Sequence, residues 1–187
     1  MDWVNEIIEQ IYSGEPELKK LLIKHSMQVK EKAFRIADNA GVTINRETVA
    51  AGAMLHDIGI IRCYAPDILC RGGKHYLAHG ITGSAMLREI DPSLEVYALI
   101  CERHTGSGLT AAEIKAAGLP LPERDFLPES IEEKLICLAD KFFSKSGKMT
   151  EKPLCRIRQS MEKFGSEPLK RFDELCRIFK IALSDGA

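Results

Sequence analysis

The chain has 187 residues, of which 26 are Lys or Arg and 27 are Asp or Glu, so its formal net charge is −1. A chain of this length suits one compact domain that needs no disulfide bridges to be stable. The near-neutral balance gives no support for general nucleic-acid binding through a basic face, although it is compatible with a local basic pocket. The six cysteines form no C-x-x-C pair, which gives no support for a zinc-ribbon or thioredoxin-like protein.

The first residues, MDWVNEIIEQIYSG, begin with an acidic side chain and lack a long apolar stretch. They therefore predict no signal peptide, and no later window has the length of a membrane span. We expect a cytoplasmic protein with reduced cysteines and no membrane partner.

Turn residues divide the chain into eight or nine helical segments. In the first half, helices are expected at residues 2–13, 16–40, 45–59 and 78–90. Pro16 opens the second helix, Gly41 ends it, and Asn45 caps the third. Residues 60–76 lack helical periodicity and are expected to form a loop.

The second half continues after Asp91-Pro92 with a helix over 93–104. In the loop-rich stretch 105–130, Thr110 and Glu113 form the capping box of a short helix. A second capping box, Ser130 with Glu133, opens the helix that carries Asp140. The chain closes with helices at 153–164 and 168–184, the second opened by Pro168. Because no run shows the period-two alternation of β-branched residues that strands require, the predicted class is all-α.

Polar residues fall on the apolar faces of several of these helices. His25 shares a stripe with Leu21, Leu22 and Val29, and Asp140 lies within the apolar run LICLADKFF. A single such histidine is explained by a hydrogen bond in the core, and Asp140 alone by a buried Lys or Arg partner. Together, four histidines and two aspartates at inward positions predict a shared cation site, because buried carboxylates are costly unless they are paired or bind metal. Gly59 ends the third helix where His56 and Asp57 can both reach one ion.

These residues resemble the HD superfamily of metal-dependent phosphohydrolases, whose pattern is a helical histidine, an HD pair and a distant aspartate. The matching segments are LIKHSMQV with His25, MLHDIG with His56 and Asp57, and CLADK with Asp140. Further similarity to two-metal members, among them bacterial diadenosine tetraphosphatases and a group of uncharacterised HDIG proteins, lies in AHGITGSA with His79 and RHTG with His104. The resemblance covers residues 18–146.

The resemblance implies a helical bundle that holds two metal ions. It implies that His25, His56, Asp57 and Asp140 hold the first ion, and that Asp57, His79 and His104 hold the second. The expected ions are divalent transition metals, iron or manganese first, with zinc, cobalt, nickel or magnesium as alternatives. Residues 1–187 are expected to form a single HD domain. The extension at 150–187 is expected to pack on the core or to form a homodimer contact.

The expected function is hydrolysis of a phosphoester or phosphoanhydride by a metal-bound hydroxide, with Asp57 as the bridging carboxylate. A phosphorylated small molecule, a nucleotide in particular, is the expected partner, and residues 105–130 are expected to shape the entrance of its pocket. Two other functions fit the same ligands: a di-iron oxygenase that cleaves C–C or C–P bonds, and a nucleotide-binding module without turnover.

The substrate contacts are less determined by the sequence. Many relatives have a lysine directly after HDIG, where this chain has Ile60. The candidates to supply the missing charge are Arg62, Lys74, Arg103 and Lys141. His75, four residues before His79, either protonates the leaving group or is an exposed loop residue.

Overall fold

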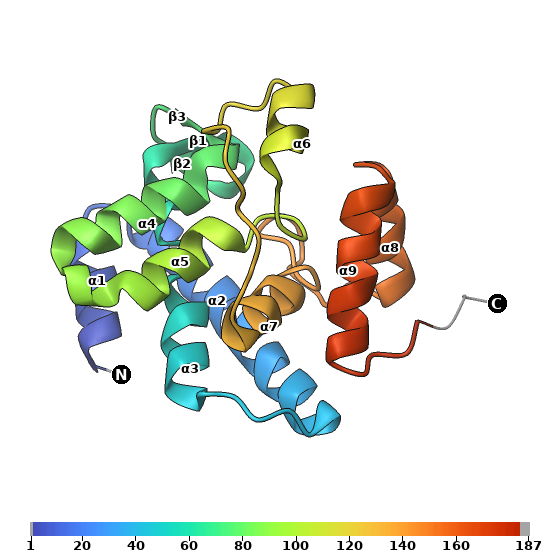
Figure 1. Cartoon of the computed structure of the whole chain (residues 1–187). Coiled ribbons are helices and arrows are strands. Elements are labelled where there is room, and N and C mark those ends of the chain that lie inside the picture. Colours follow the sequence, from blue (N-terminus) through green and yellow to red (C-terminus); the bar gives the residue numbers. More distant parts are fainter. Residues whose placement is uncertain (1, 184–187) are drawn as a thin grey trace.

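The computed structural model describes residues 2–183, and it confirms the all-α class. Nine α-helices lie within this range. Their bounds are α1 Asp2–Tyr12, α2 Pro16–Ala40, α3 Arg46–Leu55, α4 His79–Ile90, α5 Glu95–Arg103, α6 Ala111–Ala116, α7 Ile131–Asp140, α8 Leu154–Glu162 and α9 Ser166–Ile178. Figure 1 shows α2, α3, α5 and α7 at the centre of the bundle, α1 at one side, and α8 with α9 at the other.

The helix ends follow the local signals of the sequence in most places. Gly41 adopts the left-handed conformation that ends α2, with φ of 65°. The side chain of Asn45 accepts a hydrogen bond from the backbone N–H of Thr48 and so caps α3. The Thr110–Glu113 capping box is present in full at α6.

Two expected helix boundaries and one expected capping box need correction. The α3 helix ends at Leu55 and not at Gly59, and a 3-10 turn, η1 (Ile58–Arg62), follows the HD pair. The Glu133 carboxylate bonds the N–H of Glu129, so only the Ser130 half of the second capping box forms. The α9 helix begins at Ser166, two residues before Pro168.

Residues 60–76 contain structure that the expected loop lacked. Three short strands, β1 (Cys63–Ala65), β2 (Cys70–Arg71) and β3 (Lys74–His75), form a sheet in the order β2-β1-β3. The β1 strand pairs antiparallel with β2 and parallel with β3. Strands of two or three residues are too short to show a period of two, so the sequence pattern could not reveal them. Two further 3-10 turns, η2 (Pro66–Ile68) and η3 (Tyr76–Ala78), complete this segment, and η4 (Pro92–Leu94) precedes α5.

Two clusters of buried apolar residues form the core, and α2, α3 and α5 contribute to both. In α2, Leu22 belongs to one cluster and Val29 to the other, and His25 lies between them in sequence. In α5, shortly before His104, Ile100 belongs to the cluster of Val29 and Cys101 belongs to the cluster of Leu22. Three of the helices next to expected ligands, α2, α3 and α5, therefore connect the two parts of the core.

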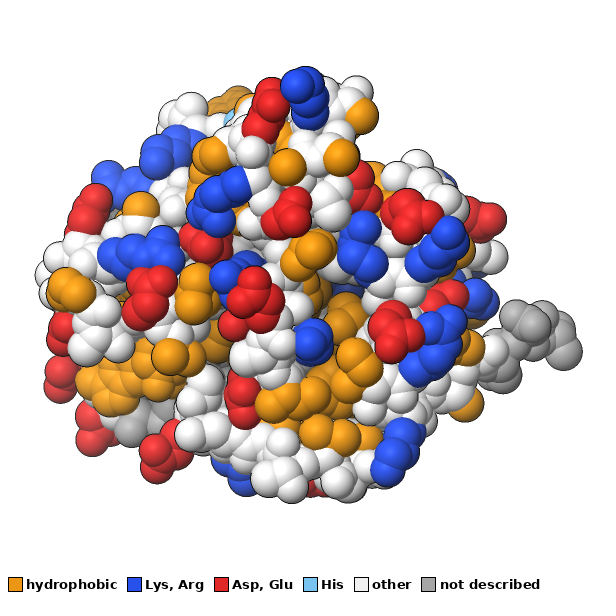
Figure 2. Space-filling view, in the orientation of Figure 1, with side chains coloured by type: hydrophobic (Ala, Val, Ile, Leu, Met, Phe, Trp, Pro, Cys, Tyr) orange, Lys and Arg blue, Asp and Glu red, His pale blue; other side chains and the backbone are white. Residues whose placement is uncertain are grey.

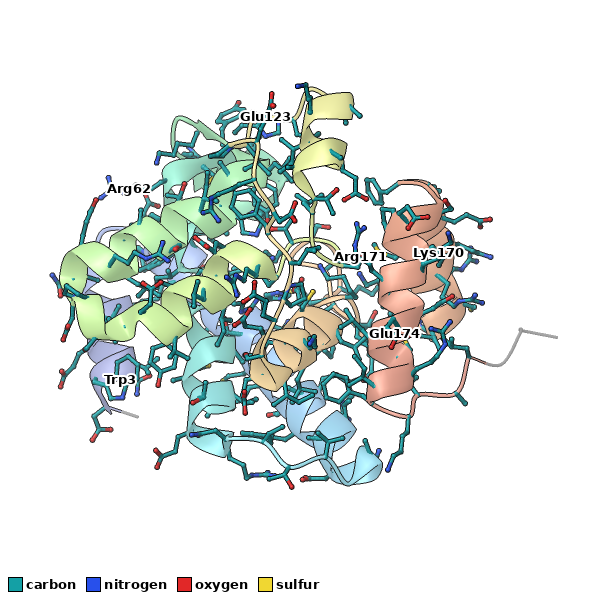
Figure 3. The ribbon with its side chains drawn as sticks, in the orientation of Figure 1. Trp3, Arg62, Glu123, Lys170, Arg171 and Glu174 are labelled. Atoms are coloured by element: carbon teal, nitrogen blue, oxygen red, sulfur yellow. The ribbon has the colours of Figure 1, made fainter. Side chains whose placement is uncertain are left out.

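The C-terminal helices are part of the same fold. Ile157 of α8 and Phe172 of α9 belong to the cluster that includes Leu135 and Leu138 of α7. In Figure 3 the side chain of Arg171 points from α9 toward α6, and its guanidinium lies 2.7 Å from the Glu113 carboxylate. Among residues 2–183, none of the helices combines the length and apolar character that a membrane span requires.

Gly59 provides a test of how the HD pair is positioned. A Cβ atom at Gly59 would lie 2.2 Å from the carbonyl oxygen of His79 and 2.4 Å from the nitrogen of Gly83, both in the backbone of α4. We expect Gly59→Ala to reduce the free energy of unfolding by about 1–3 kcal/mol, because neither backbone atom can move without shifting α4. Urea unfolding measures this change. Gly14→Ala is the matched control, since a Cβ there meets nothing within 4 Å, and an equal loss in both variants would contradict the explanation.

Candidate metal centre

Six buried side chains from five segments converge at the centre of the bundle. They form two groups that could each hold a cation, with all ligand atoms of a group within 4.8 Å of one another. The members are His25, His56, Asp57 and Asp140 in one group, and Asp57, His79 and His104 in the other. These are the two sets that the resemblance implied. Figure 2 agrees with their burial, since almost no histidine surface is visible on the face it shows.

Asp57 is common to both groups, and its two oxygens face different partners. One oxygen, Oδ2, lies 3.2 Å from His25 Nε2 and 3.0 Å from His56 Nε2. The other, Oδ1, lies 3.4 Å from His79 Nε2 and 3.5 Å from His104 Nε2. One carboxylate can therefore serve two cations, one at each oxygen.

Asp140 completes the first group from the C-terminal end of α7. Its Oδ1 lies 2.9 Å from His25 Nε2 and 3.6 Å from His56 Nε2. Asp57 is fully buried and Asp140 is 7% exposed. Two carboxylates so far from water need positive charge close by.

Backbone carbonyls fix the orientation of three of the histidine rings. The Nδ1 of His56, His79 and His104 bonds the carbonyl oxygen of the residue three positions earlier, at 2.7, 2.8 and 2.7 Å respectively. A carbonyl only accepts, so Nδ1 carries the proton, and in a neutral ring Nε2 presents its lone pair to the centre. This arrangement is typical of metal-ligating histidines.

Close approach of two helices brings the second group together. A Cβ atom at Gly80 would lie 2.5 Å from the carbonyl oxygen of Cys101, so glycine beside His79 lets α4 approach the end of α5. As a result, Nε2 of His79 lies 3.0 Å from Nε2 of His104. Two lone pairs at this distance repel unless a proton or a cation lies between them.

The electrostatics of the centre favour bound cations. Burial, followed by the neighbouring His104, lowers the pKa of His79 to about 3, and burial also lowers the pKa of His104. Both rings are therefore neutral, as metal ligands must be. The Oδ1 of Asp57 and the Nε2 of His56 are buried without a hydrogen-bond partner among the described residues. The donor set and these unsatisfied atoms fit divalent metal ions.

Lys145 lies at this centre although the sequence did not single it out. It follows the end of α7 by five residues, and its Nζ is 2.6 Å from Asp57 Oδ2. Burial opposes its charge, but Asp57 raises its pKa above the ordinary value. Helical periodicity could not identify Lys145, because it belongs to the loop that follows the helix.

A cavity of about 620 Å³ adjoins the centre at Asp140. Its charged wall consists of Lys141, Lys145, Lys152 and Arg156, together with Asp67 and Asp140. Tyr76 also lines it and stacks on His79, with the ring centroids 4.9 Å apart. Residues from α8 therefore form one side of the pocket next to the ligands, a role beyond the packing expected for the C-terminal extension.

The loop after α5 lines a different cavity. Thr105, Leu109 and Leu119 contribute to a largely apolar cavity of about 320 Å³ beneath α8 and α9. None of residues 105–130 lines the cavity at Asp140, but Met161 borders both cavities.

The structure separates the five residues proposed for substrate handling. Only Lys141 borders the cavity at Asp140, where its Nζ lies 2.8 Å from Asp140 Oδ2. Arg62 is exposed and projects from the edge of the molecule (Figure 3). Arg103 pairs with Glu129 and Glu133, at 3.0 Å from each.

Lys74 and His75 form β3 and are exposed, because the short strand carries them to the surface. They line a separate cavity at the small sheet, and the Nδ1 of His75 accepts a hydrogen bond from the N–H of Leu77. His75 belongs to neither ligand group. The position of His75 therefore agrees with the second alternative, an exposed loop histidine.

The family model described as HD domain matches residues 22–144. The match covers most of the chain and includes all six ligand candidates. The chain belongs to the HD domain family.

Two curated relatives and one solved structure extend the comparison. The chain is 33% identical over 161 residues to a tRNA (cytidine(56)-2'-O)-methyltransferase of Picrophilus torridus, a match that covers 86% of this chain and 40% of that protein. It is 38% identical over 122 residues to the uncharacterized protein MJ0778 of Methanocaldococcus jannaschii, covering 64% of each. The chain thus spans less than two thirds of either relative.

The HD domain of the L. monocytogenes phosphodiesterase PgpH, solved in complex with cyclic-di-AMP, aligns with a TM-score of 0.52 at 18% identity. The alignment covers 97% of this chain and 99% of that one. It shows that the two chains share a fold.

Metal content tests the two groups separately. We expect the purified protein to hold two transition-metal ions, His79→Ala to retain one, and Asp57→Asn to retain neither, because only Asp57 belongs to both groups. Elemental analysis after gel filtration gives the stoichiometry. His75→Ala is the matched control and should keep both ions. Full metal content in His79→Ala would contradict the second group.

Proposed function

We propose that this protein is a metal-dependent phosphohydrolase that cleaves a phosphoester or phosphoanhydride of a nucleotide. One observation carries the proposal: two buried His/Asp groups share Asp57, and the centre they form adjoins a cavity lined by lysine and arginine. Metal ligands beside a cationic cavity suit a substrate whose reacting group is an anion.

The ligand candidates keep their expected roles in this proposal. His25, His56, Asp57 and Asp140 would hold one ion, and Asp57, His79 and His104 the other. When bound, two cations here would lower the pKa of a water molecule and offset the charge of the phosphoryl oxygens. Histidine with carboxylate suits several divalent transition metals, and iron or manganese is our proposal.

Many relatives have a lysine directly after HDIG, where this chain has Ile60. Lys145 is our candidate for the residue that supplies this positive charge instead. Ile60 is fully buried, whereas Lys145 borders both Asp57 and the cavity. A cation at Asp57 would replace the ammonium as partner of that oxygen and leave Lys145 to bind a phosphoryl oxygen. Lys141 borders the same cavity and would be the second basic contact.

The nucleotide assignment has separate support. Met161 lines both the apolar cavity formed by Thr105, Leu109 and Leu119 and the cationic cavity, which supports binding of a base near a phosphate. PgpH, which shares the fold, is named as a phosphodiesterase and was solved with a cyclic dinucleotide.

A phosphoester panel tests the proposal with the metal-loaded protein. We expect phosphate or nucleotide release from at least one nucleotide, and we expect Asp57→Ala to reduce it to background because both ions lose a ligand. Chromatography of the products measures this. Oxygen uptake with a polyol or phosphonate and no ester cleavage would instead support the oxygenase. Tight nucleotide binding without any product would support the binding module.

Lys145 gives a second test with two readouts. In Lys145→Gln we expect turnover to fall about 100-fold, as for loss of a donor to the developing charge. We expect metal affinity to stay equal or to rise, because the ammonium no longer competes for Asp57. Steady-state kinetics and metal titration measure the two effects. A parallel loss of metal and activity would indicate a structural role. Lys148→Gln, at an exposed lysine of the same loop, is the control.

A further inference from the structure

The cavity at Asp140 is lined by more basic side chains than the two carboxylates of the metal centre can pair with. Lys141 lies 2.8 Å from Asp140, and Lys145 lies 2.6 Å from Asp57. These two lysines are therefore each matched by a carboxylate of the centre. The other two cations of the wall, Lys152 and Arg156, have no such carboxylate partner among the described residues.

Lys152 and Arg156 have no carboxylate within 4.0 Å in the range 2–183. The Arg156 guanidinium donates a hydrogen bond of 3.5 Å to the side-chain oxygen of Gln159. Most other basic side chains of residues 141–180 are paired with a carboxylate, as Arg158 is with Asp173 at 2.9 Å. Figure 2 shows the same mixing of charges over the face in view, where blue and red side chains alternate. Two unpaired cations beside one cavity depart from that pattern.

The environment of Lys152 opposes its charge. The side chain is half-buried, and burial lowers its pKa. Among the neighbouring charges, Asp140 has the largest effect and raises the pKa of Lys152, whereas Lys141 and Lys145 lower it. An anion in the cavity would relieve this repulsion, because it would be close to all three ammonium groups. The hydroxyls of Ser144 and Ser160 also line the cavity and can donate to such an anion.

Both unpaired cations lie beyond the residues that the family model matches, which end at 144. Lys152 directly precedes Pro153, the residue that caps α8, and Arg156 lies in the first turn of that helix. The core cluster holds α8 through Ile157, which also lines the cavity. The C-terminal segment therefore adds a fixed basic wall to a centre that the HD domain supplies.

We propose that Lys152 and Arg156 form a subsite for a second, non-reacting phosphate group of the substrate. The inference rests on the proposed function, in which the first phosphate reacts at the metal centre beside Lys141 and Lys145. It narrows the substrate class to compounds with at least two phosphate groups, such as nucleoside polyphosphates or bisphosphates. A monophosphate ester would leave the two cations without a partner.

Binding of inorganic anions tests the subsite without turnover. Protein as purified is titrated calorimetrically with tripolyphosphate and, separately, with orthophosphate, and elemental analysis afterwards checks that the metal is retained. We expect Lys152→Gln/Arg156→Gln to bind tripolyphosphate about 10-fold more weakly than the wild type, with a smaller change for orthophosphate. Both side chains reach the surface, so the variant should fold, and its thermal unfolding verifies this.

The control is Lys163→Gln/Lys170→Gln, which removes the same charge. Lys163 is exposed at the end of α8, and Lys170 projects from α9 away from α6 (Figure 3). We expect this control to bind tripolyphosphate within about twofold of the wild type, as for exposed charges away from the site. Equal weakening in both double variants would overturn the subsite, because it would reflect net charge alone.

Kinetics separates this inference from the proposed function. With a hydrolysed polyphosphate substrate, the Lys152→Gln/Arg156→Gln variant should show a raised KM and an unchanged kcat. If no ester is hydrolysed but the variant still loses tripolyphosphate binding, the hydrolase proposal fails and the subsite stands. If esters are hydrolysed and the variant binds tripolyphosphate as the wild type does, the subsite is wrong and the hydrolase proposal stands.

Discussion

The carboxylate of Asp57 imposes the strongest constraint on this structure. It is fully buried, and its Oδ1 has no hydrogen-bond partner among the described residues. Around it lie four histidine Nε2 atoms and one lysine, all within 3.5 Å. A charge in this position is stable only if opposite charge surrounds it. The rest of the bundle is arranged to meet that requirement.

The backbone performs much of this arrangement. Three carbonyl groups hold three imidazole rings in one tautomer, and glycine at positions 59 and 80 allows α4 to approach its neighbours. Three of the helices next to the ligand candidates, α2, α3 and α5, also connect the two parts of the core. Packing that stabilises the fold therefore fixes the geometry of the centre as well.

The sequence predicted the helices and the converging side chains because both leave a periodic signal. His25 and Asp140 interrupt apolar stripes, and a polar residue at such a position requires an explanation. The short strands at 63–75 left no such signal, and His75 could not be assigned until β3 placed it at the surface. Lys145, Lys152 and Arg156 lie in loops or at a helix start, where only the folded chain determines what they contact. The sequence thus predicted the buried centre better than the wall of its cavity.

Burial of the ligand candidates would also affect how the protein acquires a metal ion. His25, His56 and Asp57 are completely inaccessible, and the other three candidates are at most 7% exposed. The cavity at Asp140 borders only one of the six candidates, so an ion leaves the centre only when the buried side chains around it move apart, and such opening is rare in a well-packed core. We expect slow exchange, so that the ions found in a preparation record the supply during synthesis and not the order of equilibrium affinities. The expression medium would then influence which metal is isolated.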